Sequence, residues 1–194
     1  MRKLVVTEFI SLDGVMEAPG GDDGYVHGAW TMPFWSDELA EFKSAEMAAA
    51  DALLLGRVTY QGFAAAWPER SGDEFSDKMN SMEKYVVSKT LESAAWNNST
   101  ILRGDLVSAI NELKGRDGAD IIVHGSATLA QGLLGADLVD ELRLATYPLT
   151  LGIGKKLFGP DTRLDFTAVD SALSSTGVTL TTYAARRADR SVVL

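Results

Sequence analysis

The sequence predicts an α/β fold with a mostly parallel central sheet, helices on both faces and antiparallel strands near the C-terminus. Short apolar runs alternate with segments of helical periodicity through the first two-thirds of the chain, which is typical of strand–helix–strand units. Farther along, Val178, Leu180 and Thr182 alternate with other residues, a spacing that indicates antiparallel strands. With 194 residues, of which 46% are hydrophobic and 23% charged, the chain has the size and composition of one globular domain.

The individual elements follow from local patterns of apolar and turn residues. Strands are expected at 3–9, 52–55, 84–88, 99–102, 120–124 and 140–147, and helices at 37–50 and 59–66. Two further helices are expected after Asp105 and Ser126, which would cap them. Segment 10–36 is rich in Gly, Asp and Pro and predicts a long functional loop, and 67–83 predicts a polar connection. The domain is predicted to span 1–184, with 185–194 as a flexible tail.

The composition argues against several classes of function. The net charge is −9, so the surface repels a phosphate backbone and we expect no nucleic-acid partner. Cysteine is absent and the two histidines, His27 and His124, lie far apart, so no metal site is expected. Neither a membrane-spanning stretch nor a secretory signal is expected. These features predict a cytoplasmic protein without a membrane partner, in which backbone amides or a local basic cluster hold any anion.

Three predicted strands end in polar, small or basic residues, and the carboxyl ends of parallel strands meet at one edge of a sheet. The first of these strands continues into Gly56, Arg57, Val58 and Thr59. Gly56 allows a sharp turn, Thr59 would cap the following helix, and Arg57 offers a fork of donors for a phosphate near the helix N-terminus. A capped turn with a solvated arginine explains the same residues without a ligand.

The other two strand ends carry similar groups. Ser88 ends the second of these strands and Lys89 follows it; both suit a terminal phosphate, although an ordinary polar turn has the same composition. After the third strand, the amides of Gly125 and Ser126 would face a pyrophosphate at the start of a helix. Together the three strand ends predict a dinucleotide site. The cofactor-binding residues that we expect are Gly56, Arg57, Val58, Thr59, Ser88, Lys89, Gly125, Ser126, Ala127 and Thr128.

These segments resemble those of the dihydrofolate reductases in type and order. The run 56–60, Gly-Arg-Val-Thr-Tyr, resembles the Gly-Arg-x-Thr segment of that family; 87–89 resembles the strand end that holds the cofactor's 2′-phosphate, and 123–126 the Gly-Gly turn at the pyrophosphate. Ser-Leu-Asp-Gly at 11–14 and the segment 138–152 are closer to the reductase domain of the bifunctional riboflavin-biosynthesis deaminase/reductase. The resemblance covers nearly the whole chain and implies a dihydrofolate-reductase-like three-layer fold that binds NADPH.

The resemblance also singles out three side chains for catalysis. It places Asp13 beside the nicotinamide and the substrate, whereas an Asx turn is the structural alternative. Glu38 follows a Trp-x-x-Pro segment and matches the substrate-binding acid of the dihydrofolate reductases, although acids are favoured in any first helical turn. His124 stands where the riboflavin reductases have a substrate-binding Glu, and a core histidine is the alternative. This change and the missing deaminase half argue against activity on the riboflavin-pathway pyrimidine.

The sequence therefore predicts an NADPH-dependent reductase that transfers a hydride to a small planar heterocycle, such as a pterin, a pyrimidine or a flavin-like ring. Trp30, Phe34 and Trp35 would either cover that ring or anchor their loop to the core. The alternative function is a dinucleotide-binding regulatory module without turnover. We also expect a homodimer through segments 140–147 and 178–183 as an exposed sheet edge, because the riboflavin reductases that the chain resembles are dimeric.

Overall fold

The computed structural model describes residues 1–21, 24–160 and 163–186, which form eight strands, five α-helices and one short 3-10 helix at Met32–Phe34. The strands are Leu4–Ser11 (β1), Ala50–Gly56 (β2), Glu83–Val87 (β3), Ser99–Leu102 (β4), Asp120–His124 (β5), Glu141–Tyr147 (β6), Phe166–Leu173 (β7) and Thr179–Ala185 (β8). The helices are Asp37–Ala49 (α1), Arg57–Ala66 (α2), Glu74–Ser81 (α3), Leu106–Gly115 (α4) and Ala127–Gly135 (α5).

All eight strands belong to one sheet, in the order β4-β3-β2-β5-β1-β6-β8-β7. Strands β1 to β6 run parallel to one another. Strand β8 is antiparallel to both β6 and β7. The predicted α/β class, with a mostly parallel sheet and antiparallel C-terminal strands, is therefore confirmed. The chain inserts β5 between β1 and β2, and such a reversal of strand order marks the place where open α/β sheets bind ligands.

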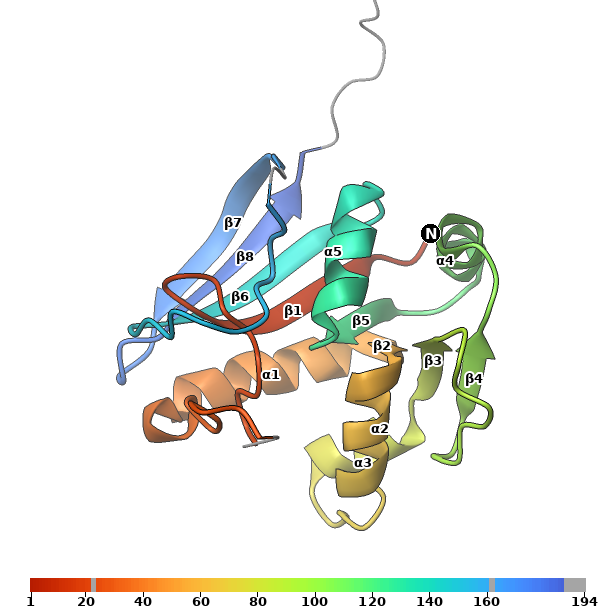
Figure 1. The fold of residues 1–194 in the computed structure, drawn as a ribbon, viewed down its shortest axis with the longest axis horizontal. Helices are drawn as coiled ribbons and strands as arrows, with labels where there is room; N and C mark the ends of the chain where they lie inside the picture. The colour runs from red at the N-terminus through yellow and green to blue at the C-terminus, as the bar shows by residue number, and fades with distance from the viewer. Residues whose placement is uncertain (22–23, 161–162, 187–194) are drawn as a thin grey trace, which may run out of the picture.

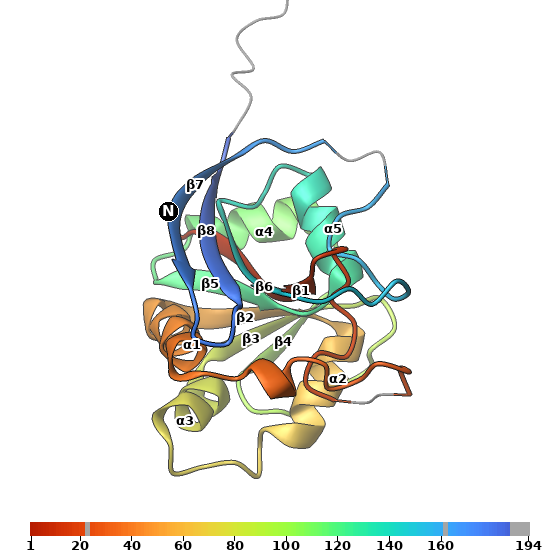
Figure 2. The same cartoon turned by 90° about the vertical axis from the view of Figure 1, so that its left-hand side faces the viewer.

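Helices cover both faces of the sheet, which gives three layers (Figures 1 and 2). Helices α4 and α5 pack on one face, where Leu113 and Leu133 join a core with Leu4 and Val6 of β1. Helices α1, α2 and α3 cover the other face, over a second core centred on β2 and β3. Because β1 and β5 lie between the two helical layers, alternate side chains of these strands face opposite layers.

One helix was not predicted. The connection expected at 67–83 contains α3, which begins after Asp73, whose carboxylate accepts a hydrogen bond from the Ser76 N–H at 2.9 Å. Only Ser76 and Met79 are buried along this helix. Two buried residues on a short, polar segment make too brief an apolar pattern to predict a helix from the sequence.

The predicted sheet edge is wrong. Strands β6 and β8, which contain most of 140–147 and 178–183, each have a neighbouring strand on both sides, and the edges are β4 and β7. The reason is that β7 adds outside β8, so that β8 becomes an inner strand. Regular structure extends past residue 184, the predicted end of the domain. Strand β8 ends at Ala185, and the Arg186 N–H donates to the Asp165 carbonyl at 2.9 Å. The remainder of the predicted tail, 187–194, lies outside the described residues.

Candidate functional site at the carboxyl edge of the sheet

The N-termini of α2 and α5 lie side by side at the carboxyl edge of the sheet. Strands β2 and β5 are neighbours, and each leads at once into its helix, α2 or α5 (Figure 1). The Gly56 N–H donates to the Ser126 Oγ at 2.9 Å, and the Ser126 N–H donates to the Thr59 Oγ1 at 3.0 Å. These two hydrogen bonds fix one helix start against the other.

Neither of these two helices has a side-chain cap, unlike the other α-helices of the described chain. Ser36, Asp73 and Asp105 accept N–H bonds at the starts of α1, α3 and α4, as predicted for Asp105. The predicted caps Thr59 and Ser126 are wrong, because both side chains accept the bonds that join α2 to α5 instead. The first N–H groups of a helix have no partner within it and carry partial positive charge. Two uncapped helix starts at one place therefore favour an anion.

The turn between β5 and α5 has two consecutive left-handed residues, Gly125 with φ +56° and Ser126 with φ +62°. A Cβ on Gly125 would lie 3.2 Å from the Thr59 Cγ2, so glycine suits this position for space as well as conformation. The Gly125 N–H donates to the Glu8 Oε2 at 3.0 Å, and the Ser126 N–H is bonded to Thr59. Contrary to the prediction, these two amides are already bonded. The first amides beyond them belong to 127–128, at the start of α5.

The predicted phosphate residues Arg57, Ser88 and Lys89 come together at neighbouring strand ends. Gly56 pairs with Val87 in the β2–β3 register, so Arg57 and Ser88 follow adjacent positions. Ser88 is buried and its Oγ accepts N–H bonds at 3.2 and 2.9 Å from the next turn, whereas Arg57 and Lys89 are exposed. A hollow of about 460 Å³ opens here. Its lining residues are Val87, Ser88, Lys89, Leu102, Arg103, Gly104, Asp105 and Leu106.

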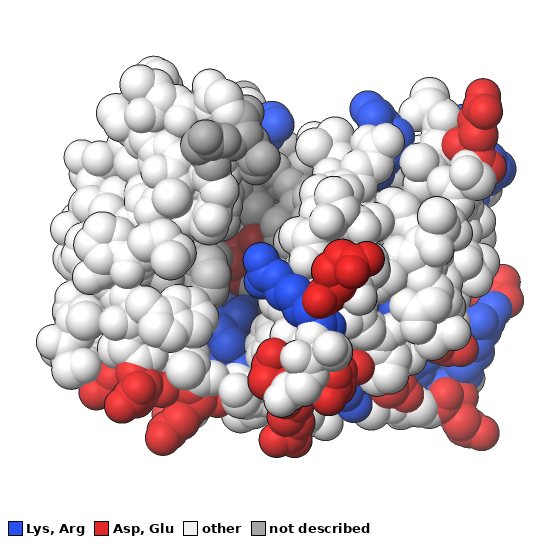
Figure 3. All heavy atoms as spheres, turned by 90° about the horizontal axis from the view of Figure 1, so that it is seen from below, with Lys and Arg blue, Asp and Glu red and all other residues white. Residues whose placement is uncertain are grey.

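Arg103 is a member of this hollow that the sequence analysis missed. It follows β4, and its guanidinium donates to the Leu91 carbonyl at 2.6 Å and to the Lys89 carbonyl at 3.5 Å. Arg103 therefore adds a second cation beside Lys89. Figure 3 shows a face of the molecule on which acidic side chains gather along one rim while basic side chains lie in and beside a groove. The surface therefore carries a local basic cluster although the net charge of the chain is negative.

A buried polar cluster lies on the α1 side of β1 and β5, and the sequence analysis found only its histidine. Thr7 of β1 is the register partner of His124 of β5. The Thr7 Oγ1 donates to the Glu46 Oε1 at 2.8 Å and accepts from the Lys43 Nζ at 2.7 Å. Lys43 and Glu46 form an ion pair at 2.5 Å, and both side chains are buried. Lys43 and Glu46 lie four and seven positions after buried Leu39, on the same inner face of α1. This spacing is the sequence pattern that could have indicated their burial.

Burial shifts the pKa values of two ionisable groups at these strand ends toward the uncharged form. Burial lowers the pKa of His124 well below its usual value, and the Lys43 ammonium lowers it further. The Nε2 of His124 is buried and has no hydrogen-bond partner. Burial likewise raises the pKa of Glu8 well above its usual value, against the opposing effects of Lys43 and the Gly125 N–H. One carboxyl oxygen of Glu8, Oε1, is also buried without a partner.

Asp13 holds two loops together. Its carboxylate accepts hydrogen bonds from the Ser11 Oγ at 2.7 Å, the Leu151 N–H at 3.0 Å and the Gly152 N–H at 2.8 Å. These bonds, led by the Ser11 hydroxyl, lower the pKa of Asp13 to about 2. The carboxylate is therefore ionised, and its oxygens bind a distant loop rather than the N–H two residues on, which bonds to the Ser11 Oγ. A catalytic role for Asp13 remains a prediction.

Glu38 is exposed and bonds to the turn between β7 and β8. Its carboxylate accepts from the Ser175 Oγ at 3.0 Å and from the Ser175 N–H at 3.3 Å. Bonds with its own backbone, Ser36 and Ser175 lower the pKa of Glu38. These contacts join α1 to the C-terminal hairpin, and none of them reaches His124. A substrate-binding role for Glu38 likewise remains a prediction.

The aromatic residues of the first long loop divide between the two uses considered for them. Trp30 is buried and packs edge-on against Tyr147 with 5.1 Å between ring centroids, and Phe34 packs on the same ring at 5.7 Å. These two residues anchor the loop to the core. Trp35 is 51% exposed and stays available for another contact.

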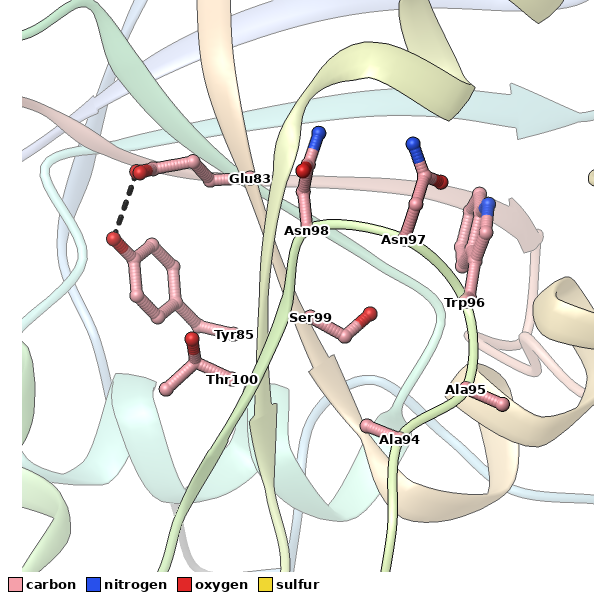
Figure 4. Close-up of a pocket in the computed structure, with 9 residues that line it drawn as sticks. All are labelled: Glu83, Tyr85, Ala94, Ala95, Trp96, Asn97, Asn98, Ser99 and Thr100. Carbon is pink, nitrogen blue, oxygen red and sulfur yellow. Dashed lines mark hydrogen bonds between the residues drawn. The ribbon is translucent and has the colours of Figure 1, made fainter.

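A second hollow, of about 380 Å³, lies at the opposite edge, where β3 and β4 begin (Figure 4). The Tyr85 hydroxyl donates to the Glu83 carboxylate at 2.8 Å in this hollow. Asn97 and Asn98, from the loop before β4, line it as well. No lysine or arginine lines this hollow. A carboxylate without a cation does not suit a phosphate, so this hollow is not the dinucleotide site.

The fold and the paired helix starts together define a protein of the dihydrofolate-reductase-like class. The chain belongs to the RibD C-terminal domain family, which matches residues 2–180. The uncharacterized protein YyaP of Bacillus subtilis (strain 168) is 27% identical over 187 residues, which cover 94% of each chain. The family resemblance inferred from the sequence is thus confirmed.

Solved structures of related proteins share the fold. A candidate riboflavin biosynthesis protein from Shewanella sp. PV-4 has a TM-score of 0.70 at 24% identity, over 95% of this chain and 99% of that one. A pyrimidine reductase-like protein from Corynebacterium diphtheriae has a TM-score of 0.64 at 14% identity, over 96% and 93%. Dihydrofolate reductase from Enterococcus faecalis, complexed with NADP(H) and RAB-propyl, has a TM-score of 0.62 at 14% identity, over 95% and 97%. The chain therefore has a reductase-type fold.

Two further findings concern the described residues as a whole. No helix among them combines the length and the apolar character needed to cross a membrane. They also contain no group of three or more His, Asp or Glu side chains placed to hold a metal ion.

Proposed function

We propose that the protein is a reductase that uses bound NADPH to transfer a hydride to a small planar heterocycle. The observation that carries this proposal is the pair of uncapped helix N-termini, α2 and α5, joined through Gly56, Thr59 and Ser126. Such a pair fits the two phosphates of a dinucleotide. Hydride chemistry would come from the cofactor, so the chain itself needs to bind, orient and exclude water.

The choice of NADPH over NADH rests on the basic strand ends. Arg57 and Ser88 follow adjacent register positions, and Lys89 and Arg103 line the same hollow. A 2′-phosphate in that hollow would meet Lys89 and Arg103, with Arg57 following the neighbouring strand. Charge-assisted hydrogen bonds contribute about 1.5–3 kcal/mol each, which corresponds to about one to two decades in affinity. NADPH should therefore bind more tightly than NADH.

Titration calorimetry on variants tests this assignment. Arg57→Ala and Lys89→Ala should each weaken NADPH binding by about one to two decades and leave NADH binding nearly unchanged. Arg116→Ala is a matched control, because Arg116 is an exposed cation that pairs with Glu112 at the end of α4. Equal affinity for the two cofactors in the unmodified protein would contradict the assignment.

A substrate panel tests turnover. Small-molecule sites usually combine apolar walls with a few polar groups, and a flat heterocycle such as a pterin, a pyrimidine or a flavin-like ring suits a site of that kind. Consumption of NADPH is followed with dihydrofolate, the riboflavin-pathway pyrimidine, flavins and quinones. We expect turnover of at least one ring compound and little activity on the riboflavin-pathway pyrimidine. Tight NADPH binding without turnover of any compound would favour a dinucleotide-binding module.

We further propose that the protein is a homodimer in the cytoplasm, where a chain without cysteine suits the reducing conditions. The edge strand β7 supports assembly, because Val169 is 58% and Leu173 is 70% exposed on it. Apolar residues on an exposed edge favour pairing with another strand. Sedimentation at micromolar concentration should show a dimer that Leu173→Lys weakens, and a monomer would contradict the proposal.

A further inference from the structure

Glu8 is a buried acid in a row of apolar core residues. Val6 and Ile10 lie two positions before and after it, on the same face of β1, and both are buried. Glu8 is 5% exposed, and its Oε2 accepts the Gly125 N–H at 3.0 Å. Its Oε1 has no hydrogen-bond partner within the described part of the chain. Burying a carboxyl that is only half hydrogen-bonded costs free energy, so an apolar residue would suit the core better.

The sheet register places Glu8 beside the turn between β5 and α5. Thr7 and His124 are the last pair between β1 and β5, and β1 continues beyond it to Ser11. Glu8 therefore follows Thr7 at the level where Gly125 follows His124. The hydrogen bond between Glu8 and Gly125 joins residues 117 positions apart in the sequence. The carboxyl thus lies where it can hold this turn from the side of β1.

The turn is in a conformation that needs support. Gly125 and Ser126 are both left-handed, with φ +56° and +62°, and the second of them is not a glycine. A left-handed serine is strained, and the surrounding contacts have to outweigh that strain. The Thr59 Oγ1 accepts the Ser126 N–H at 3.0 Å, and the Ser126 Oγ accepts the Gly56 N–H at 2.9 Å. Both of these bonds come from the start of α2, whereas Glu8 supplies a bond from β1.

We propose that Glu8 is a positioning residue, which holds the Gly125–Ser126 turn in its left-handed form and so directs the first N–H groups of α5 at the pyrophosphate of the dinucleotide before it binds. This inference rests on the proposed function, because it concerns the same cofactor site. Glu8 acts through the Gly125 N–H. A site that is already ordered binds more tightly, because the ligand does not have to supply the free energy of ordering it.

Loss of the carboxyl oxygen changes the turn first. The Gly125 N–H would lie in the interior without its acceptor, which favours rotation of the peptide unit between residues 124 and 125. The start of α5 would then adopt other directions in part of the molecules. Part of the binding free energy of NADPH would go into restoring the turn. We expect the affinity for NADPH to fall about 5- to 30-fold, the factor that corresponds to one strained backbone conformation.

Titration calorimetry with two ligands measures this effect. NADPH carries both the 2′-phosphate and the pyrophosphate, whereas adenosine 2′-monophosphate carries the 2′-phosphate without the pyrophosphate. Glu8→Met replaces the carboxyl by an unbranched apolar group of similar length. It should weaken NADPH binding about 5- to 30-fold and leave the Kd of adenosine 2′-monophosphate within about twofold. Glu8→Gln keeps an oxygen for the Gly125 N–H and should bring NADPH binding to within about threefold of the unmodified protein.

Asp73→Ala is the matched control. Asp73 is also a carboxylate that accepts a backbone N–H, that of Ser76 at 2.9 Å, but it caps α3 and not one of the two paired helix starts. Its loss should lower the stability of the fold and leave both Kd values unchanged. If Asp73→Ala weakens NADPH binding as much as Glu8→Met does, general destabilisation explains the effect and the proposal is overturned.

Hydrogen exchange in the unmodified protein gives a test that does not depend on the folding of any variant. If Glu8 holds the turn before the cofactor arrives, the Gly125 amide should be protected without NADPH, and NADPH should add little to its protection. A Gly125 amide that exchanges at the unprotected rate until NADPH is added would overturn the proposal.

The two ligands also separate this role of Glu8 from the proposed function. If the unmodified protein fails to bind NADPH or adenosine 2′-monophosphate, the proposed function is contradicted. If it binds both, three results contradict the role of Glu8 alone. These are unchanged NADPH binding in Glu8→Met, an equal loss of affinity for both ligands in that variant, and a folded Glu8→Gln variant that does not restore NADPH binding.

Discussion

The substitution Glu8→Gln should stabilise the protein increasingly as the pH rises. Glu8 is 5% exposed, its Oε2 accepts the Gly125 N–H at 3.0 Å, and its Oε1 has no partner. Burial raises the pKa of this carboxyl well above its usual value of 4.5. A glutamine has nearly the same shape and still offers an oxygen to Gly125, but it does not ionise.

The magnitude follows from proton linkage. Between pH 4.5 and the raised pKa of Glu8, the folded protein holds a proton that the unfolded chain releases. The free energy of unfolding therefore falls as the pH rises through this window, by about 1.4 kcal/mol per pH unit. The glutamine variant lacks this loss, so its advantage should grow by the same amount. For a chain of this size that is about 3 to 6 °C in Tm per pH unit.

Urea unfolding of both proteins at a series of pH values measures the difference. The contribution of His124 is common to both proteins, so it cancels in the comparison. Glu112→Gln is the control, since Glu112 is exposed and pairs with Arg116 on α4. Its effect should hardly vary with pH. If the difference between Glu8→Gln and the unmodified protein is constant above about pH 5, Glu8 is ionised in the fold and the reasoning from burial is refuted.

Three further predictions concern other buried or bonded groups. Burial lowers the pKa of Lys84 from 10.5 to about 8, so between these pH values the unfolded chain binds a proton that the folded protein does not. The free energy of unfolding should therefore rise as the pH increases from 8 to 10.5. Urea unfolding of Lys84→Met should show no such rise. Tyr60→Phe leaves the buried Trp96 N–H without its acceptor at 3.0 Å and should cost about 1–3 kcal/mol, and an unchanged Tm would contradict this. Asp13→Asn should lower Tm at neutral pH, because only the ionised carboxylate holds the loops together. The difference in Tm from the unmodified protein should vanish as the pH falls from 3.8 through about 2. A difference that persists in acid would show another cause.

The sequence predicts the fold well wherever each element has its own local signal. Buried runs such as 120–124 and the Asp105 cap identify β5 and the start of α4 to within a residue. The order of strands at the C-terminal end has no such signal. An inner strand and an edge strand can have similar alternation, so only the pairing of β7 with β8 shows that β8 is internal.

The site is predictable in part for a similar reason. Strand ends followed by small, polar or basic residues mark the carboxyl edge, and the register does bring Arg57 beside Ser88. The Lys43–Glu46 pair is different, because charged residues three apart on a helix usually face water. Its burial depends on a contact with Thr7, which is 36 positions from Lys43 in the sequence. Local patterns cannot supply such a contact, and the same holds for the bond between Ser126 and Thr59.

The central claim is that the paired starts of α2 and α5 hold a dinucleotide with a 2′-phosphate. A calorimetric titration of the unmodified protein with NADPH, repeated with NADH under the same salt conditions, tests it most directly. The account predicts one NADPH bound per chain, with a Kd lower than that of NADH by about a decade or more. No heat of binding with either compound, or the same Kd for both, would contradict it.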